Sequence, residues 1–384
     1  MAPKSIINRP VEISLRLIGA WPNSSGRNLI HIMWTTVMST FLVHQYWYCI
    51  AHVKTDDLPD LLDGLSLTLS NTLLLLKFII IWFNNRVFSE TLALMAEDWS
   101  NCNSGWDMEV MIQKATLSYR IAKFMLAVFT FSISTYVIST LFSPGDAVEI
   151  SNSSEKRFLL RMEFPFDATV SPIYEIIVAV QVVAQSIFSL MAGMCMALIA
   201  TFVIHIASQI DVVCDRLSEV LNHPNEQLRI SMIKNLVTKH QRIVALFENI
   251  EDIFTFISFL QFFFNITAMC FVGFILVTSL GSDQASTVIS KCLPYYIALN
   301  FEALILCYTG EYLSSKSENI GWVAYNSNWY ELTMYENRTL LLLILRSQKP
   351  LTLTIGKFMN LSLETFANML KASASYISVL HAME

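Results

Sequence analysis

Long apolar segments constrain the fold of this chain more than any other feature of its sequence. A helix that crosses a bilayer needs about 20 mostly apolar residues. Seven segments meet or approach that length: Leu29–Ile50, Leu61–Phe83, Leu117–Phe142, Ile173–Ile206, Ile253–Leu280, Val288–Leu313 and Phe358–Met383. Lipid offers no partner for backbone N–H and C=O groups, so each segment must satisfy them internally as a helix. We therefore predict an all-α membrane protein with seven transmembrane helices.

The composition agrees with this prediction. Hydrophobic residues make up 54% of the 384 positions and charged residues only 15%. A soluble domain carries about 25% charged residues. The mean hydropathy of +0.49 also excludes an ordinary soluble protein.

The placement of Lys and Arg predicts the orientation. Seventeen of the 25 basic residues precede the first span or fall in the alternate loops that share its side, and five fall on the other side. Basic residues accumulate on the cytosolic side of a membrane. We expect a cytosolic N-terminus and an extracellular C-terminus. Asn152, in the sequence NSS of an outer loop, is then a candidate glycosylation site.

The loops predict additional helices on the cytosolic side. Residues 207–252 place apolar side chains three and four positions apart, which indicates helical extensions of the fourth and fifth spans. A further helix at about 325–346 is too short to span and should pack against those extensions. We thus divide the chain into residues 1–313, with spans one to six, and residues 314–384, with this cytosolic helix and the seventh helix at about 350–383.

The seventh helix is unusually polar for a membrane segment. Eight polar or charged residues lie within the seventeen positions from Ser362 to Ser378. At 100° per residue, one stripe holds small and polar side chains: Thr365, Asn368, Ala372, Ser375, Val379 and Ala382. Water along this stripe would remove the cost of burying polar groups in lipid. We therefore expect a water-filled conduit to which several subunits each contribute this helix, with apolar Val379 as a gate that dewets. A contact between helices through small residues is the alternative reading.

Catalytic and metal-binding patterns are missing from the sequence. The seven histidines lie far apart, no Cys-x-x-Cys occurs and no Gly-rich phosphate loop is present. We expect neither an enzyme nor a cofactor or metal. Lys77 and Glu302 are charged residues inside predicted spans: Lys77 is expected to reach the cytosolic interface along its own stem, and Glu302 has either a structural or a functional role.

Several motifs resemble the carboxyl-terminal signature of insect olfactory receptors. They are NWYEL at 328–332, LRSQKPLTLTIGKF at 345–358 and LSLETFANMLKASASYISVL at 361–380. FPFD at 164–167 and CYTGEYL at 307–313 also fit the family. This resemblance implies an odorant-gated, non-selective cation channel of four subunits, joined by a cytosolic helical anchor domain.

The resemblance also implies partners and roles. The chain ends SVLHAME, unlike the olfactory coreceptor, and is therefore similar to the ligand-specific subunits that form heterotetramers with that coreceptor. Alignment with the family places Val379 at the gate, Ser375 one turn inward and Ala382 at the outer filter. The expected setting is the plasma membrane of sensory-neuron dendrites, with lipid, permeant cations and a small volatile organic ligand as partners, and no nucleic acid.

The family's odorant site lies in the outer half of the bundle, between helices two, three, four and six. Mapped onto this chain, that region supplies Thr72, Leu73, Leu76, Phe131, Thr135, Ile138, Tyr174, Val178, Gln181, Tyr295, Tyr296 and Leu299. Such a lining suits a small volatile held by shape and dispersion.

Three other classes remain open. An insect gustatory receptor would share the fold but would not need the coreceptor. A metabotropic seven-helix receptor would have an extracellular N-terminus. A secondary transporter would contain inverted repeats and broken helices, and no such repeat is visible.

Overall fold

The computed structural model describes residues 26–54, 57–102, 105–141, 158–221, 223–281 and 285–383, with a few positions between 12 and 21. Its α-helices are α2 (Arg27–His52), α3 (Leu58–Phe83), α4 (Asn85–Ser100), α5 (Gly105–Leu141), α6 (Ile173–Leu221), α7 (Glu226–Thr278), α8 (Ala285–Tyr325), α9 (Met334–Ser347) and α10 (Leu363–Met383). A 3-10 helix, η2 (Trp329–Glu331), and two short strands, β1 (Thr354–Ile355) and β2 (Met359–Asn360), complete the described elements. The all-α prediction is confirmed.

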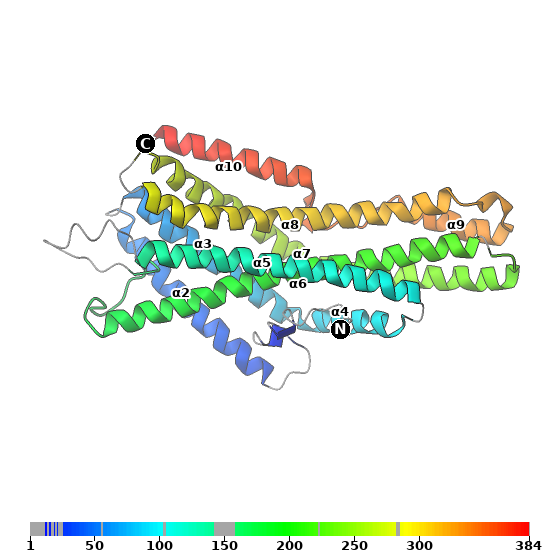
Figure 1. Ribbon diagram of the computed structural model, residues 1–384, viewed down its shortest axis with the longest axis horizontal. Helices are drawn as coiled ribbons and strands as arrows, with labels where there is room; N and C mark the ends of the chain where they lie inside the picture. The colour runs from blue at the N-terminus through cyan, green and yellow to red at the C-terminus, as the bar shows by residue number, and fades with distance from the viewer. Residues whose placement is uncertain are drawn as a thin grey trace.

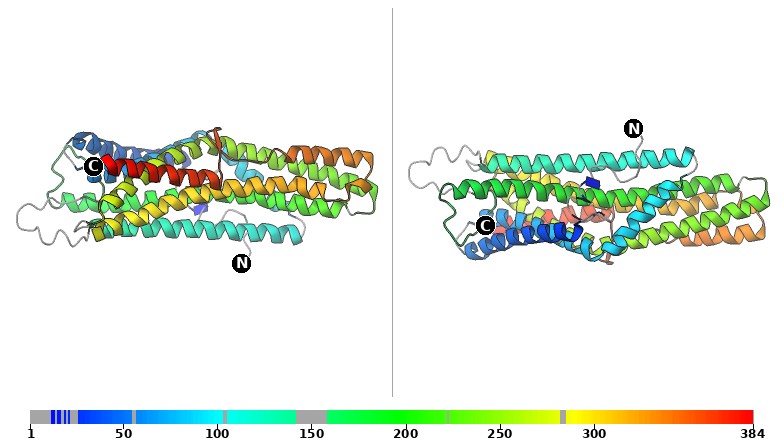
Figure 2. Two further views of the ribbon diagram at one scale, coloured as in Figure 1. Left: turned by 90° about the horizontal axis from the view of Figure 1, so that it is seen from above. Right: turned by 90° about the horizontal axis from the view of Figure 1, so that it is seen from below.

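The helices form one elongated bundle in which α5, α6, α7 and α8 run lengthwise (Figures 1 and 2). We call the end that contains α9 the α9 end, and the end at which α10 terminates the C-terminal end. Helices α6 and α7 contain 49 and 53 residues, and they reach the α9 end as the predicted extensions. Helix α6 is the central element, because Phe202, Val203 and Ile206 on different faces are all fully buried.

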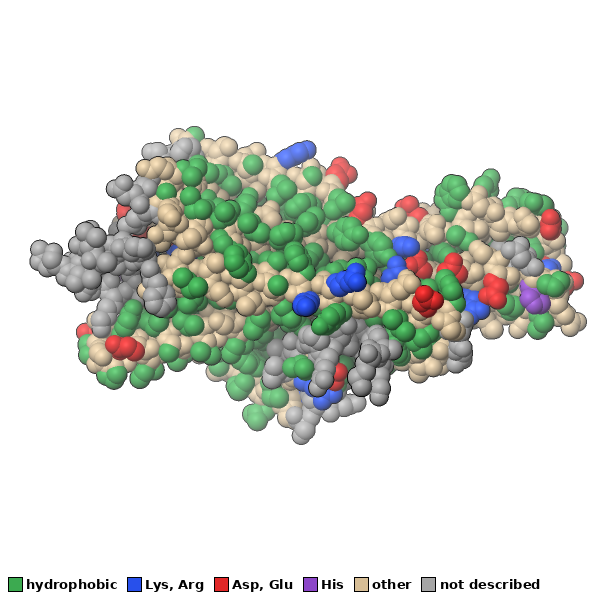
Figure 3. All heavy atoms as spheres, viewed as in Figure 1, with side chains coloured by type: hydrophobic (Ala, Val, Ile, Leu, Met, Phe, Trp, Pro, Cys, Tyr) green, Lys and Arg blue, Asp and Glu red, His purple; other side chains and the backbone are tan. Residues whose placement is uncertain are grey.

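Each predicted span falls in its own helix. In the described part of the chain, five helices are long and apolar enough to cross a membrane: α3, α5, α6, α7 and α8. Helices α2 and α10 correspond to the first and seventh predicted spans but are more polar. On the face in Figure 3, charged side chains gather toward the α9 end, whereas the surface nearer the C-terminal end is mostly hydrophobic or uncharged. That distribution is the one expected of a membrane-embedded half and a solvated half.

The seventh helix begins later than predicted. A β-hairpin occupies the region before it, with Thr354 paired to Asn360 across the two strands. Gly356 and Lys357 turn the chain with φ of 59° and 65°, a left-handed conformation that ends any helix reaching this point. The boundaries of about 350 and Phe358 are therefore wrong, and α10 starts at Leu363.

The hairpin is fixed to the side of α7. The Gly356 backbone N–H donates to the Thr255 carbonyl at 3.0 Å, and the Thr354 hydroxyl hydrogen-bonds to the Glu251 carboxylate. The hairpin thereby attaches the N-terminal end of α10 to α7, one of the lengthwise helices.

Helix α9 packs against α8 and α7 at the α9 end. Its first turn is closed by a capping box, in which Thr333 and Glu336 satisfy each other's backbone N–H groups. Leu341, Leu342 and Leu345 remain exposed on its outer side. The predicted helix at 325–346 is thus resolved into the end of α8, η2 and α9.

Candidate functional site

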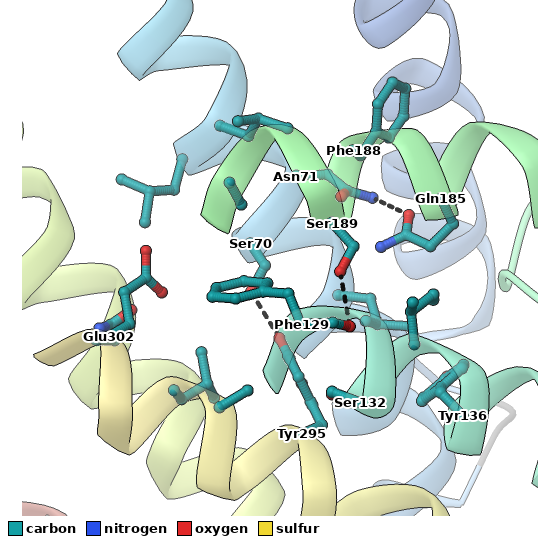
Figure 4. A pocket seen from close by; sticks show the side chains of 18 of the residues that line it. Ser70, Asn71, Phe129, Ser132, Tyr136, Gln185, Phe188, Ser189, Tyr295 and Glu302 are labelled. Carbon is teal, nitrogen blue, oxygen red and sulfur yellow. Dashed lines mark hydrogen bonds between the residues drawn. The ribbon is translucent and has the colours of Figure 1, made fainter. Parts of the chain in front are cut away.

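A cavity lies inside the bundle between α3, α5, α6 and α8, with one residue from α7 (Figure 4). It leaves about 70 Å³ for the centres of water-sized spheres. One water molecule needs roughly 10–15 Å³ by this measure, so the space suits several waters or one small organic molecule. The apolar part of the lining comprises Leu67, Leu73, Leu74, Phe129, Ile133, Tyr136, Phe188, Ala192, Tyr295, Ala298 and Leu299. An apolar cavity with a few polar groups is the usual form of a small-molecule site.

A buried ion pair lies at one side of this cavity. The Lys77 Nζ on α3 and the Glu302 Oε1 on α8 are 3.0 Å apart, and the two residues are 2% and 5% exposed. The expectation that Lys77 reaches the cytosolic interface is therefore wrong. An isolated charge would be costly at this depth, whereas a paired charge is stabilised by its partner.

Two pairs of polar side chains border the opposite side of the cavity. The Asn71 Nδ2 donates to the Gln185 Oε1 at 3.1 Å, which joins α3 to α6. Tyr295 and Ser70 share a hydrogen bond of 2.6 Å between their hydroxyls, which joins α8 to α3. Figure 4 shows these pairs bordering the cavity and Glu302 at its far side. The helices around the cavity are thus held by side-chain hydrogen bonds as well as by packing.

The segment before α6 packs against the outer side of the cavity wall. Leu160 is fully buried in a cluster with Tyr136 and Tyr295, which also line the cavity. The Gln181 side chain holds this segment, because it accepts from the Leu160 N–H at 3.2 Å and donates to the Leu160 carbonyl at 3.3 Å. The segment that contains Leu160 therefore packs directly against residues of the cavity wall.

Three of the twelve positions that we associated with a ligand line this cavity: Leu73, Tyr295 and Leu299. The other nine lie elsewhere: Thr72, Leu76, Phe131, Thr135, Ile138, Tyr174, Val178, Gln181 and Tyr296. Among these, the Thr72 hydroxyl bonds to Tyr46 of α2, and Phe131 and Ile138 face outward from the bundle. Tyr296 packs toward α7 and α10.

The polar part of the cavity lining was not predicted from the sequence. Asn71, Gln185 and Asn265 were not assigned to a site, and Lys77 was assigned to the interface. A usable signal was present: an intramembrane charge marks the interior face of its helix. Ser70, Leu74 and Lys77 are four and three residues apart, so Lys77 alone would have indicated the correct face of α3.

Helix α10 lies at the edge of the bundle against α7 and α8 (Figure 2). Met369 and Ser373 are its buried contacts, and Ile377 packs where Gly273 leaves room on α7. The opposite side carries most of the predicted stripe. Asn368, Ser375, Val379 and Ala382 are exposed, Ala372 is half-buried and Thr365 is buried. The stripe therefore faces away from the chain's own bundle.

Two further predictions concern sites outside this cavity. Asn152, the candidate glycosylation site, lies outside the described residues. Within the described ranges, no group of three His, Cys, Asp or Glu side chains is placed to hold a metal ion.

Comparisons with known proteins agree on one family. A family model described as 7tm Odorant receptor matches residues 57–374. Odorant receptor 13a of Drosophila melanogaster is 23% identical over 99% of this chain and 97% of its own length. Odorant receptor 67c of the same species is 23% identical over 76% of this chain and 73% of its own length. Among solved structures, the olfactory receptor OR5 of Machilis hrabei in complex with eugenol superposes with a TM-score of 0.81, at 18% identity, over 97% of each chain.

Proposed function

The chain belongs to the insect odorant receptor family, and from that premise we propose that it is a ligand-specific subunit of an odorant-gated, non-selective cation channel. The observation that carries the proposal is the outward-facing stripe of α10. Its polar and small side chains include Asn368 and Ser375, which are exposed on the side that faces away from the described helices of the chain. A helix with this surface suits a conduit formed between subunits, because water there satisfies groups that lipid cannot.

The cavity is the proposed binding site for a small volatile ligand. Leu73, Tyr295 and Leu299 come from α3 and α8, and Phe129 and Phe188 add aromatic surface from α5 and α6. The nine other predicted ligand positions are not part of this proposal. Ligand binding can favour the open channel only by being stronger in that state than in the closed one.

The proposed pore is lined by four helices, one from each subunit: α10 of this chain and the corresponding helix of each coreceptor subunit. Val379 forms the gate, Ser375 and Ala372 lie inward of it, Asn368 lies further in, and Ala382 lies at the outer filter. The exposed fraction of Val379 in the single chain is 56%, so its side chain is available to an axis outside the bundle. The remaining subunits are supplied by the olfactory coreceptor, and contacts at the α9 end hold the heterotetramer together.

The proposed setting is the plasma membrane of a sensory-neuron dendrite. The N-terminus faces the cytosol and the C-terminus faces the exterior, as the distribution of Lys and Arg indicates. The α9 end then lies in the cytosol.

Cysteine accessibility tests the pore. Single cysteines at Ser375, Val379 and Ala382, in the chain co-expressed with the coreceptor, should react with membrane-impermeant thiol reagents and block current. Ser373→Cys is the matched control, because Ser373 is on the same helix but is 1% exposed and faces α7. If none of the four cysteines reacted, with or without ligand, the conduit would lie elsewhere.

Recordings with and without the coreceptor test the subunit type. Odorant-evoked current only with the coreceptor supports a ligand-specific subunit. Equal current from this chain alone would favour the gustatory-type channel. An epitope at residue 1 that is accessible on intact cells would instead favour a metabotropic receptor.

A further inference from the structure

The cavity lining contains one charged pair and one incompletely paired amide, which come from three different helices. Lys77 lies on α3, Glu302 on α8 and Asn265 on α7, and all three line the cavity. Each is at most 5% exposed. Among the described residues that line the cavity, no other side chain carries a formal charge.

Each of these side chains has unused hydrogen-bonding capacity. An ammonium has three N–H donors, and Lys77 directs two of them to the Glu302 Oε1 at 3.0 Å and the Met196 Sδ at 3.9 Å. The Glu302 Oε2 makes no hydrogen bond within the described part of the chain. The Asn265 Oδ1 accepts from the Gln261 Nε2 at 2.7 Å. The Asn265 Nδ2 is buried without a partner among the described residues. Buried polar groups of this kind require a partner from a ligand or water.

The charges restrict what that partner can be. Lys77 and Glu302 together are neutral, so a neutral ligand leaves the site balanced. An ionised amine or carboxylate would add a buried charge with no counter-ion, which is strongly unfavourable.

The hydrogen-bonding pattern also restricts which functional group the ligand can carry. A hydroxyl group both donates and accepts, so it can donate to the Glu302 Oε2 while accepting from Lys77 or Asn265. An ether, ketone or ester only accepts, and would leave the Glu302 oxygen unpaired. A site built around a hydroxyl rejects analogues that lack one, because its own buried polar groups then lose their partner.

We propose that this cavity selects small neutral alcohols or phenols, with the hydroxyl seated between Lys77, Glu302 and Asn265. This inference rests on the proposed binding role of the cavity and names the class of ligand. The apolar remainder of the ligand lies toward Phe129 (Figure 4) and the other aliphatic and aromatic side chains of the lining, which include Leu73.

Direct binding to the purified full-length protein, assembled with the coreceptor in nanodiscs, tests the inference. The probes are hexanol and phenylethanol, and for each skeleton the methyl ether, the carboxylic acid and the amine. Ligand-dependent thermal stabilisation gives apparent affinities. We expect each alcohol to bind about tenfold to a hundredfold more tightly than its ether, the range for a hydrogen bond to a charged group. The acid and amine should bind more weakly than the alcohol.

Two variants test whether the preference for alcohols over ethers depends on Lys77, Glu302 and Asn265. Lys77→Met/Glu302→Met removes the ion pair while keeping the site neutral and its volume similar, so the fold should persist. The ratio of alcohol to ether affinity should fall to about one, with ether binding retained. Asn265→Leu should lower the same ratio and provides an independent measurement if the double variant does not fold.

A buried polar pair outside the cavity supplies the control. Ser118 and Thr201 share a hydrogen bond of 2.7 Å between α5 and α6. The Ser118→Ala/Thr201→Val variant should keep the wild-type ratio. Equal affinities for alcohol and ether in the wild type, or a ratio unaffected in the Lys77/Glu302 and Asn265 variants, would overturn the inference. Alcohol-selective binding without any evoked current would support it and refute the proposed channel function.

Discussion

Glu336 joins α9 to α7, and its removal should release α9. Its carboxylate is 0% exposed and accepts from the Arg229 Nε at 2.5 Å and Nη2 at 3.1 Å. It also accepts from the Thr333 N–H at 2.8 Å and hydroxyl at 2.7 Å, which completes the capping box. The perturbation is Glu336→Ala.

The magnitude follows from these contacts. Breaking one partner of a buried ion pair costs about 3–5 kcal/mol, because the other charge stays buried. The lower figure applies here, since the Arg229 side chain is 13% exposed and keeps a hydrogen bond to the His223 carbonyl at 3.0 Å. Loss of the cap adds about 1 kcal/mol. The free energy for opening α9 should fall by about 4 kcal/mol, a roughly thousandfold increase in the open population.

Amide hydrogen exchange of the protein in nanodiscs measures this directly. Protection of the α9 amides should fall by about three orders of magnitude, while protection of α10 changes little. Glu331→Ala is the control, because Glu331 is a nearby exposed glutamate in η2. A loss of less than tenfold in α9 protection, or an equal loss in the control, would refute the assignment of Glu336 as the link between α9 and α7.

The remaining predictions concern pH, the membrane half and α7. Burial raises the pKa of Glu336, but hydrogen bonds from Arg229 and its cap outweigh this, so the pKa lies below its usual value. Its stabilisation should therefore be complete above about pH 4.3 and be lost as the pH falls through the lowered pKa, as exchange at a series of pH values would show. Lys77→Met alone should destabilise the fold by about 3 kcal/mol or more, measured by thermal unfolding, because the buried carboxylate loses its partner. Gly310→Ala would place a Cβ 2.6 Å from the backbone oxygen of Leu361, and should lower the thermal unfolding temperature at a cost of about 1–3 kcal/mol. Asn225→Ala removes the α7 cap bond to the Leu228 N–H and should cost about 1 kcal/mol in exchange protection of that first turn, whereas Asn225→Asp should not.

The fold could be predicted from the sequence because its main signals are long-range averages. Apolar segments of about 20 residues identified the spans in α3, α5, α6, α7 and α8, and helical spacing identified the extensions of α6 and α7. Helix α4 was not separated from the loop between spans. Its buried side chains Phe88, Leu92 and Met95 are four and three residues apart. This helical spacing is not detected by a search for long apolar segments.

The cavity lining was harder to predict because a lipid-facing helix is apolar on every side. On α5, the predicted Phe131 and Ile138 face outward, whereas Phe129, Ser132 and Tyr136 line the cavity. Lipid accepts large apolar side chains as readily as a protein core does, so hydropathy carries no information about the helix face. On α10, by contrast, polar and apolar residues alternate by face, and four of the six residues of the predicted stripe are exposed.

Hydrogen bonds hold the start of α10, whereas the rest of the helix is held mainly by side-chain packing against α7 and α8. The hairpin fixes the start of α10 to α7, and the Leu363 N–H donates to the Glu311 carboxylate of α8. From there to Val379 the helix extends about 24 Å at 1.5 Å per residue. A tilt of about 10° around the start of α10 would carry Val379 through about 4 Å, while side chains beside the hairpin would barely move. A small rearrangement of α7 and α8 at the start of α10 would thus produce a larger displacement of α10 at the C-terminal end.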